Sequence, residues 1–204
     1  MKITIVLISF SLFASISGIE LDEIIENTLE NYRGLTSFYA EFEQILCDEV
    51  SGTCYNYTGK VFYAEPEFFR MEIDDPKRIY IGDGAALWIY SPEEKRAIKQ
   101  DMTAVPLHIN PDMFLTDYDE RFTAELSGDT QTGYEVTLTP KDEISLYAKI
   151  VISISKEKFR ITGISIHDDI GSENKYIFEK FETNKKISKD KFVFQPPPGT
   201  QIDE

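Results

Sequence analysis

Segments in which apolar and polar residues alternate, separated by turn-forming residues, run through most of this chain. Residues 37–46 and 175–182 place aromatic or aliphatic side chains at every second position, as strands with one wetter face do. Comparable segments lie at residues 55–64, 68–73, 79–90, 96–100, 121–127, 134–139, 145–155 and 160–167. The pattern predicts a mainly β protein with about ten or eleven strands in up-and-down order.

Residues 79–90 are the most apolar of these segments and predict a hairpin. Gly82, Asp83 and Gly84 tolerate the positive φ angles of a tight turn. Both flanking strands are apolar at consecutive positions, so each face of the hairpin has apolar side chains to bury. One face can join the core. The other needs a helix, a partner or an apolar ligand to cover it.

Two segments break the β pattern. Residues 20–33 predict a helix, because Leu21, Ile24, Ile25, Thr28, Leu29 and Tyr32 follow three- and four-residue spacing. Residues 102–118 contain two prolines, and residues 112–115 within them predict a short helix whose apolar residues must pack on something.

The first eighteen residues have the features of a secretory signal peptide. Lys2 precedes an apolar run at residues 3–16, and small residues follow at Ser17 and Gly18. The run is shorter than the roughly 20 apolar residues that span a bilayer. We therefore expect a leader at 1–18 and an exported, soluble domain at 19–204, without a lipid anchor at its new N-terminus.

Charge and aromatic content narrow the function. A formal net charge of −15 repels nucleic acid and anionic membrane surfaces. The acidic residues are scattered, which fits a solvated surface or a match to a basic partner. The 14 Phe and 11 Tyr suit an apolar cavity in addition to a core.

Cys47 and Cys54 enclose a polar segment between two predicted strands. In an oxidising compartment we expect them to form a disulfide across a hairpin. A redox pair favours C-x-x-C spacing, and a metal site needs more ligands than two.

Candidate catalytic groups are few. His167 ends a strand beside Asp168 and Asp169, but no nucleophile motif accompanies it. The acidic residues Asp168, Asp169 and Glu173 lack the spacing of an EF-hand. We predict no enzymatic activity, no metal and no cofactor.

Several short motifs together resemble the LolA family of periplasmic lipoprotein carriers. They are SFYAEFEQ at 37–44, GKVFYAEPEFFRM at 59–71, DGAALWIYSP at 83–92, Asp-Ile-Gly at 169–171, Phe178, Phe181, Asn184, and FVFQPPPGTQI at 192–202. The resemblance implies a single open, incomplete antiparallel β-barrel of about eleven strands, with an α-helical lid over its concave face.

The resemblance also implies a function. The protein would take acylated lipoproteins from an inner-membrane ABC transporter and carry them through the periplasm, as a monomer, to an outer-membrane receptor where one is present. The alternative is a periplasmic domain of the same fold that binds lipid as a sensor or regulator.

Site residues follow from this picture. The expected lipid-binding floor consists of Phe42, Phe62, Phe69, Met71, Trp88, Tyr90 and Phe178. The expected lid consists of Leu21, Ile25, Leu29 and Tyr32 together with Met113, Phe114 and Leu115. One position departs from the family: Glu65 stands where well-studied carriers have a basic residue that ties the lid to the barrel. Arg70 is the nearest basic residue, so we expect a rewired or absent lid latch.

Overall fold

The computed structural model describes residues 19–102, 114–142 and 145–203. The leader expected at 1–18, and Met113 of the expected lid, lie outside these ranges. In these ranges two α-helices precede or interrupt the strands, α1 (Leu21–Tyr32) and α2 (Tyr118–Arg121), and a 3₁₀ helix, η4 (Lys189–Phe192), lies between β11 and β12. The strands are β1 (Ser37–Asp48), β2 (Thr53–Ala64), β3 (Phe68–Ile73), β4 (Arg78–Asp83), β5 (Leu87–Ser91), β6 (Arg96–Gln100), β7 (Phe122–Asp129), β8 (Gly133–Pro140), β9 (Lys149–Ser155), β10 (Ile161–His167), β11 (Glu173–Thr183) and β12 (Gln201–Asp203).

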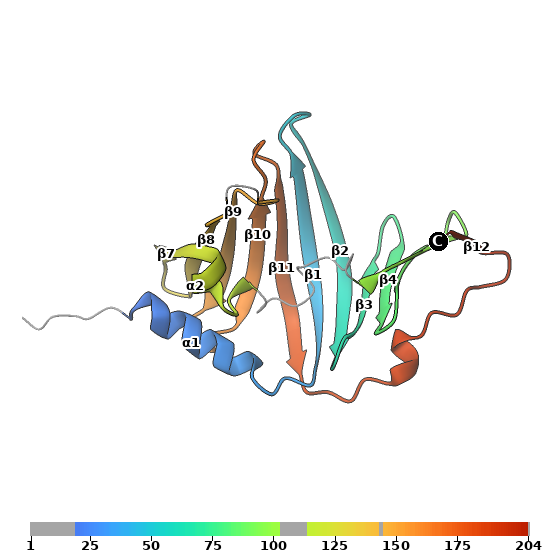
Figure 1. Cartoon of the computed structure of the whole chain (residues 1–204), viewed down its shortest axis with the longest axis horizontal. Helices are drawn as coiled ribbons and strands as arrows, with labels where there is room; N and C mark the ends of the chain where they lie inside the picture. The colour runs from blue at the N-terminus through green and yellow to red at the C-terminus, as the bar shows by residue number, and fades with distance from the viewer. Residues whose placement is uncertain (1–18, 103–113, 143–144, 204) are drawn as a thin grey trace, which may run out of the picture.

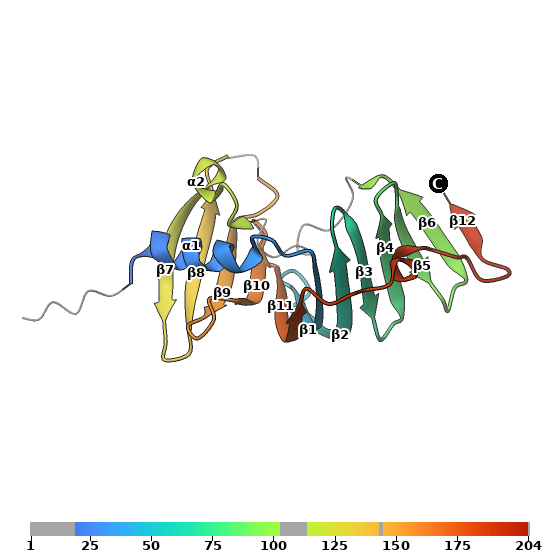
Figure 2. The same ribbon diagram turned by 90° about the horizontal axis from the view of Figure 1, so that it is seen from below.

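All twelve strands form one curved sheet that stays open (Figures 1 and 2). β1 pairs with β11 at its centre; β2 to β6 follow on one side and β10 to β7 on the other. The outermost strands are β7 and β12, which lie at opposite ends of the order. The prediction of an open antiparallel sheet of about eleven strands is confirmed. The twelfth strand, β12, is three residues long and pairs in parallel with β6.

One local prediction needs correction, and another falls partly outside the described residues. The strand expected at 145–155 begins only at Lys149, and Leu146, taken as one of its apolar positions, is 85% exposed. The helix expected at 112–115 lies partly outside the described residues. Of its two described residues, Phe114 has 3₁₀-helical conformation and Leu115 lies in a turn, and the α-helix α2 begins farther along the chain, at Tyr118.

The sheet has two chemically distinct faces because successive side chains of a strand point to opposite sides. We define the inner face as the one that carries Phe38, Ala40 and Phe42, and the outer face as the one that carries Tyr39 and Phe62. The inner face packs against the buried side of α1, formed by Ile24, Ile25, Thr28 and Tyr32. Gly34, at φ +74°, turns the chain from α1 toward β1.

The outer face of β4–β6 has a small core of its own, made by Ile79, Ile81, Tyr90 and Ala97. The C-terminal segment, residues 184–200, leaves β11 and runs toward β12 past this half of the sheet (Figure 2). Its Phe194 ring lies 5.0 Å from the ring of Trp88 and 5.4 Å from that of Tyr90. The hairpin's second apolar face is therefore covered by the chain itself.

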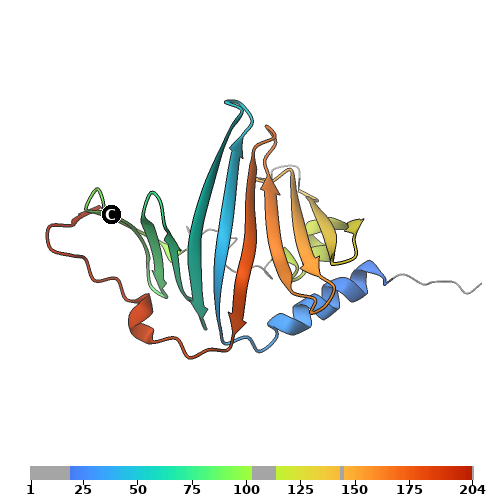
Figure 3. The same cartoon turned by 180° about the vertical axis from the view of Figure 1, so that it is seen from behind.

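β1 and β2 extend beyond their neighbours as a long hairpin (Figures 1 and 3). Cys47 and Cys54 are directly opposite each other in the register of this pair, with Cα atoms 4.1 Å apart, and form a disulfide. The disulfide joins the two strands just below the turn, in the part of β2 (Thr53–Thr58) that lies outside its pairing with β3 (Gly59–Ala64).

Candidate functional site

The interior between α1 and the inner face is the first candidate site. Ile24 and Ile25 of α1 are buried there together with Phe38 on β1. Phe114 and Leu115, which follow the undescribed residues 103–113, are buried in the same cluster. We call this cluster the inner core.

Two phenylalanines lie flat across neighbouring strands on the inner face. A Cβ atom built at Gly59 would stand 2.5 Å from the Phe42 ring, and one at Gly82 would stand 2.2 Å from the Phe69 ring. Each ring therefore occupies the space that a side chain would take on the next strand. These two glycines therefore leave the room that the aromatic rings of Phe42 and Phe69 need on this face.

The structure divides the predicted lipid-binding floor between the two faces. Phe42, Phe69, Met71 and Phe178 are buried in the inner core. The other three predicted residues, Phe62, Trp88 and Tyr90, lie on the outer face. They cannot form one floor with the residues of the inner face, so this part of the prediction is wrong. The register shows the reason: Phe62 pairs with Arg70, and Trp88 with Ile81, in a row of outer-face residues. The inner positions of this hairpin are Leu87, which is buried in the inner core, and Ile89, which packs against it.

The predicted lid residues all face the inner core where they are described. Ile25, Tyr32, Phe114 and Leu115 are buried in it, whereas Leu21 and Leu29 pack against its border. Sequence reasoning left Ile24 out of the lid, although its three-residue spacing from Leu21 placed it on the same helical face.

A few hydrogen bonds tie α1 to α2 and to the turn between β9 and β10 with the start of β10. Tyr118 Oη donates to Asp22 Oδ1 at 2.8 Å. At the other end of the helix, Asn31 Nδ2 donates to the carbonyl of Lys158 at 2.9 Å, and the Ile161 amide donates to Tyr32 Oη at 3.3 Å. These contacts lie at the two ends of α1, and apolar packing holds the helix between them.

Arg70 does not contribute to a lid latch, because its side chain is on the outer face. Its Nε donates to Glu72 Oε1 at 2.5 Å, and Nη1 donates to the carbonyl of Lys191 at 3.3 Å. Burial disfavours the charged form of Glu72, but the hydrogen bond and charge of Arg70, with the charges of Lys191 and Lys60, outweigh it and lower the pKa of Glu72. Arg70 thus fastens the C-terminal segment to β3.

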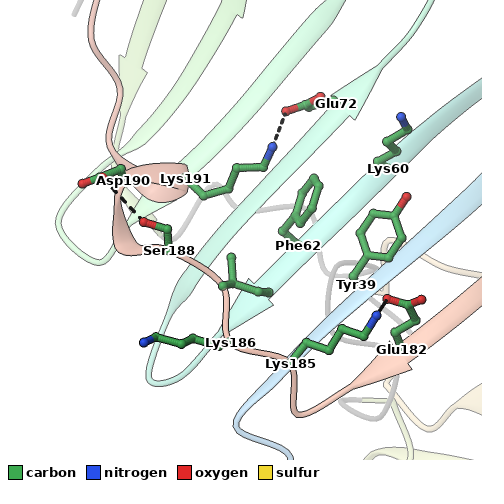
Figure 4. A pocket seen from close by; sticks show the side chains of 11 residues that line it. Tyr39, Lys60, Phe62, Glu72, Glu182, Lys185, Lys186, Ser188, Asp190 and Lys191 are labelled. Carbon is green, nitrogen blue, oxygen red and sulfur yellow. Dashed lines mark hydrogen bonds and ion pairs between the residues drawn. The ribbon is translucent and has the colours of Figure 1, made fainter.

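A second candidate site is a cavity of about 770 Å³ between the outer face and the C-terminal segment (Figure 4). Tyr39 and Phe62 line it from the strands, and Lys185 and Lys191 from the C-terminal segment. Lys191 Nζ lies 4.2 Å from the centre of the Phe62 ring and 3.7 Å from Glu72 Oε1. Lys185 forms an ion pair with Glu182. These contacts attach the C-terminal segment to the outer face, and the cavity is the space left between the two.

Three polar side chains interrupt the apolar inner face, and we call them the polar cluster: Gln44, Asn174 and Tyr176. Gln44 Nε2 donates to Asn174 Oδ1 at 2.9 Å and to Tyr176 Oη at 2.8 Å. Burial raises the pKa of Tyr176 and outweighs the hydrogen bond with Asn174, which lowers it, so the hydroxyl stays protonated. Sequence reasoning placed Gln44 on the same side as Phe42 but drew nothing from it. Its polarity at an inward position was the available signal.

A Ser-His-Glu group on β10 and β11 lacks the geometry of a catalytic relay. Ser165 Oγ lies 3.0 Å from His167 Nε2, but its hydroxyl donates to Glu173 Oε1. The serine proton therefore goes to the carboxylate and not to a histidine base. Asp168, which follows His167, accepts hydrogen bonds from the backbone amides of Ile170 and Ser172. These bonds fix the turn into β11.

Residues 33–195 match the family described as "Outer membrane lipoprotein carrier protein LolA". The chain belongs to the LolA family. An outer-membrane lipoprotein carrier protein of Coxiella burnetii is 28% identical over 98% of this chain and 97% of its own length. Those of Chromohalobacter salexigens and Aliivibrio fischeri are 23% and 26% identical, each over 82% of this chain and 80% and 83% of their own lengths.

Solved structures agree on the fold. An uncharacterised conserved protein of Thermus thermophilus superposes with a TM-score of 0.58 at 12% identity, over 89% of this chain and 96% of that one. MucB superposes with a TM-score of 0.54 at 13% identity, over 89% of this chain and 64% of its own.

The LolA-family match contains β1 to β11 and the C-terminal segment through Gln195, but begins at Arg33, directly after the last residue of α1. The assignment of α1 as a lid therefore depends on its packing against the inner core. Neither α1 nor α2 has the length and apolar character to cross a bilayer.

Proposed function

We propose that this protein carries acylated lipoproteins through the periplasm and holds their acyl chains against the inner face of its sheet. The observation that supports this most directly is the inner core. An amphipathic helix, anchored by hydrogen bonds at its ends, packs over the β7–β10 half of the apolar inner face, and Phe42, Phe69 and Met71 continue the same cluster beyond it (Figure 2). The names of the LolA-family relatives point to the same cargo.

In the empty protein α1 covers the β7–β10 half of the inner face (Figure 2). In the loaded protein, acyl chains would take the place of α1 there and extend along the floor, and α1 would swing out on the turn at Gly34. Such an exchange is binding and transport without catalysis. The leader-like residues 1–18 support export and removal of that segment. An inner-membrane ABC transporter would supply the cargo, and an outer-membrane receptor would accept it.

Photocrosslinking tests which face holds the ligand without altering the protein. A triacylated peptide with a diazirine in one acyl chain is bound, illuminated, and the labelled residues are identified by mass spectrometry. We expect labels on Phe42, Phe69 and Met71. Phe62 and Trp88 serve as internal controls, because they lie in the same half of the sheet but on the outer face. Labelling confined to the outer face, or no specific labelling, would contradict the proposal.

A release experiment separates a carrier from a domain that binds lipid only to sense it. Inner-membrane vesicles that contain the transporter, ATP and a labelled lipoprotein are incubated with and without the protein. A carrier yields a soluble complex of protein and lipoprotein in the supernatant. If the protein binds the triacylated peptide but releases nothing from vesicles with an active transporter, it is a lipid-binding sensor.

A further inference from the structure

Two members of the polar cluster, Gln44 and Tyr176, are buried beside the apolar floor, and the third, Asn174, is half-buried. Gln44 occupies the inner face of β1 between Phe42 and Leu46, and faces Tyr57 on β2 and Tyr176 on β11. Gln44 is 9% exposed and Tyr176 is 3% exposed. A purely structural core would gain stability from an apolar residue here, since a buried amide must have its hydrogen bonds satisfied.

Of the two polar atoms of the Gln44 side chain, only the amide nitrogen has hydrogen-bond partners among the described residues. Its Nε2 donates to both other members of the polar cluster and has no further hydrogen to donate. Its Oε1 accepts no hydrogen bond from any residue in the described ranges. Asn174 and Tyr176 therefore fix the amide in orientation and leave its acceptor available to another donor.

The position of the polar cluster suits the junction between an acyl chain and its head group. On one side along β1 lies Phe42, in the floor of the inner core. On the other side, Leu46 is 37% exposed and its partner Tyr55 is 52% exposed, so the inner face opens to solvent there. A ligand whose chains lie on Phe42 would have its polar end beside Gln44.

We propose that Gln44 Oε1 accepts a hydrogen bond from the amide N–H that links an acyl chain to the N-terminus of the cargo. This inference rests on the proposed carrier function and adds a basis for selecting cargo. An N-acylated peptide has an N–H group next to its acyl chain, whereas diacylglycerol and phosphatidylcholine have only ester oxygens at that point. The bond would favour acylated protein over membrane lipid, which is present in large excess in the same membranes.

The test compares two probes that differ in one atom. The first is a fluorescent triacylated cysteinyl peptide, and the second has oxygen in place of the amide nitrogen that carries the third chain. One hydrogen bond predicts that the unmutated protein binds the amide about 3- to 10-fold more tightly than the ester. Gln44→Met should remove this preference and bind both probes as the unmutated protein binds the ester. Gln100→Met, an exposed glutamine on β6, should retain it.

The outcomes distinguish this inference from the function on which it rests. Equal affinity of the two probes for the unmutated protein overturns the role of Gln44 and leaves the carrier function intact. A preference that survives in folded Gln44→Met also overturns it. If neither probe binds, the carrier function fails and the inference fails with it. The comparison on the unmutated protein needs no variant to fold.

Discussion

Replacing Ile24 by alanine tests whether α1 gives way to a ligand or belongs to a permanent core. Ile24 is fully buried against the inner core. Removing such a side chain costs about 2–5 kcal/mol of folding stability, from lost transfer free energy and the cavity left behind. In the exchange mechanism this contact exists in the closed, empty protein and is absent in the loaded one.

Thermodynamic linkage then predicts that a destabilising substitution tightens binding. Whatever free energy Ile24→Ala removes from the closed state no longer has to be overcome by the ligand. A loss of about 2 kcal/mol raises the affinity for a triacylated peptide about 30-fold, because each 1.4 kcal/mol is a factor of ten. The closed form still dominates after this loss, since Ile25 and Tyr32 remain packed, so the full effect should appear in the measured affinity.

The assay combines urea denaturation with fluorescence titration of the triacylated peptide. Glu23→Ala is the matched control, because Glu23 is an exposed neighbour on the same helix and should change neither quantity. A fixed core predicts the opposite pattern. If Ile24→Ala loses 2 kcal/mol or more but binds the peptide no more tightly than the unmutated protein, α1 is not the element that the ligand displaces.

Three further predictions concern parts of the protein away from the inner core. Replacing Cys47 and Cys54 by serine should lower stability by about 2–3 kcal/mol and the melting temperature by about 5–10 °C, because closing this short loop restricts the unfolded chain; identical calorimetric melts with and without the disulfide would refute this. Phe194→Ala should destabilise by about 1–3 kcal/mol and shift the emission of Trp88, the chain's one tryptophan, to longer wavelength, with peptide binding unchanged. Glu72 has a lowered pKa, so its contribution to stability is complete above its ordinary value of 4.5 and is lost as the pH falls below it. Unfolding at pH 7 and pH 3 should therefore show Glu72→Gln less stable than the unmutated protein at pH 7 and close to it at pH 3.

The sequence predicted the strands well where their alternation was clear. In β1, inward Phe38, Ala40 and Phe42 alternate with outward polar residues, so periodicity alone placed the strand and its buried face. The helix α1 was predicted equally well, because its apolar residues keep helical spacing. Local patterns of this kind determine local structure, and here they agreed with the tertiary fold.

The inward face of the 79–90 hairpin could not be read from the sequence. Leu87, Trp88, Ile89 and Tyr90 are all apolar, so either alternate pair could have faced the inner core. The outer pair became buried because Phe194, more than a hundred residues later, lies over it. Trp88 and Tyr90 were predicted as floor residues, but the C-terminal segment packs against them and covers them on the outer face. Phe62 failed for the same reason, between inward Val61 and Tyr63.

The energetics of exchange predict that the number of acyl chains decides which cargo is held. Each buried methylene contributes about 0.8 kcal/mol, so one sixteen-carbon chain gains about 12 kcal/mol on full burial. Displacing α1 uncovers Ile24, Ile25 and Tyr32, at about 1.5–3 kcal/mol each, or about 5–9 kcal/mol in all. One chain then leaves a net gain of about 3–7 kcal/mol, which corresponds to dissociation constants from millimolar to about 10 μM.

Two fully buried chains would gain about 24 kcal/mol and leave about 15–19 kcal/mol, whereas three would exceed the ceiling of about 18–21 kcal/mol for non-covalent binding. The third chain must therefore stay partly exposed, and a receptor could bind the exposed part of this acyl chain. We expect peptides with two acyl chains to bind at least a thousandfold more tightly than those with one, and a third chain to add far less than the second. Titration of peptides with one, two and three chains measures both steps. If affinity were the same for one chain and for two, the acyl chains would not be replacing α1 on the inner face.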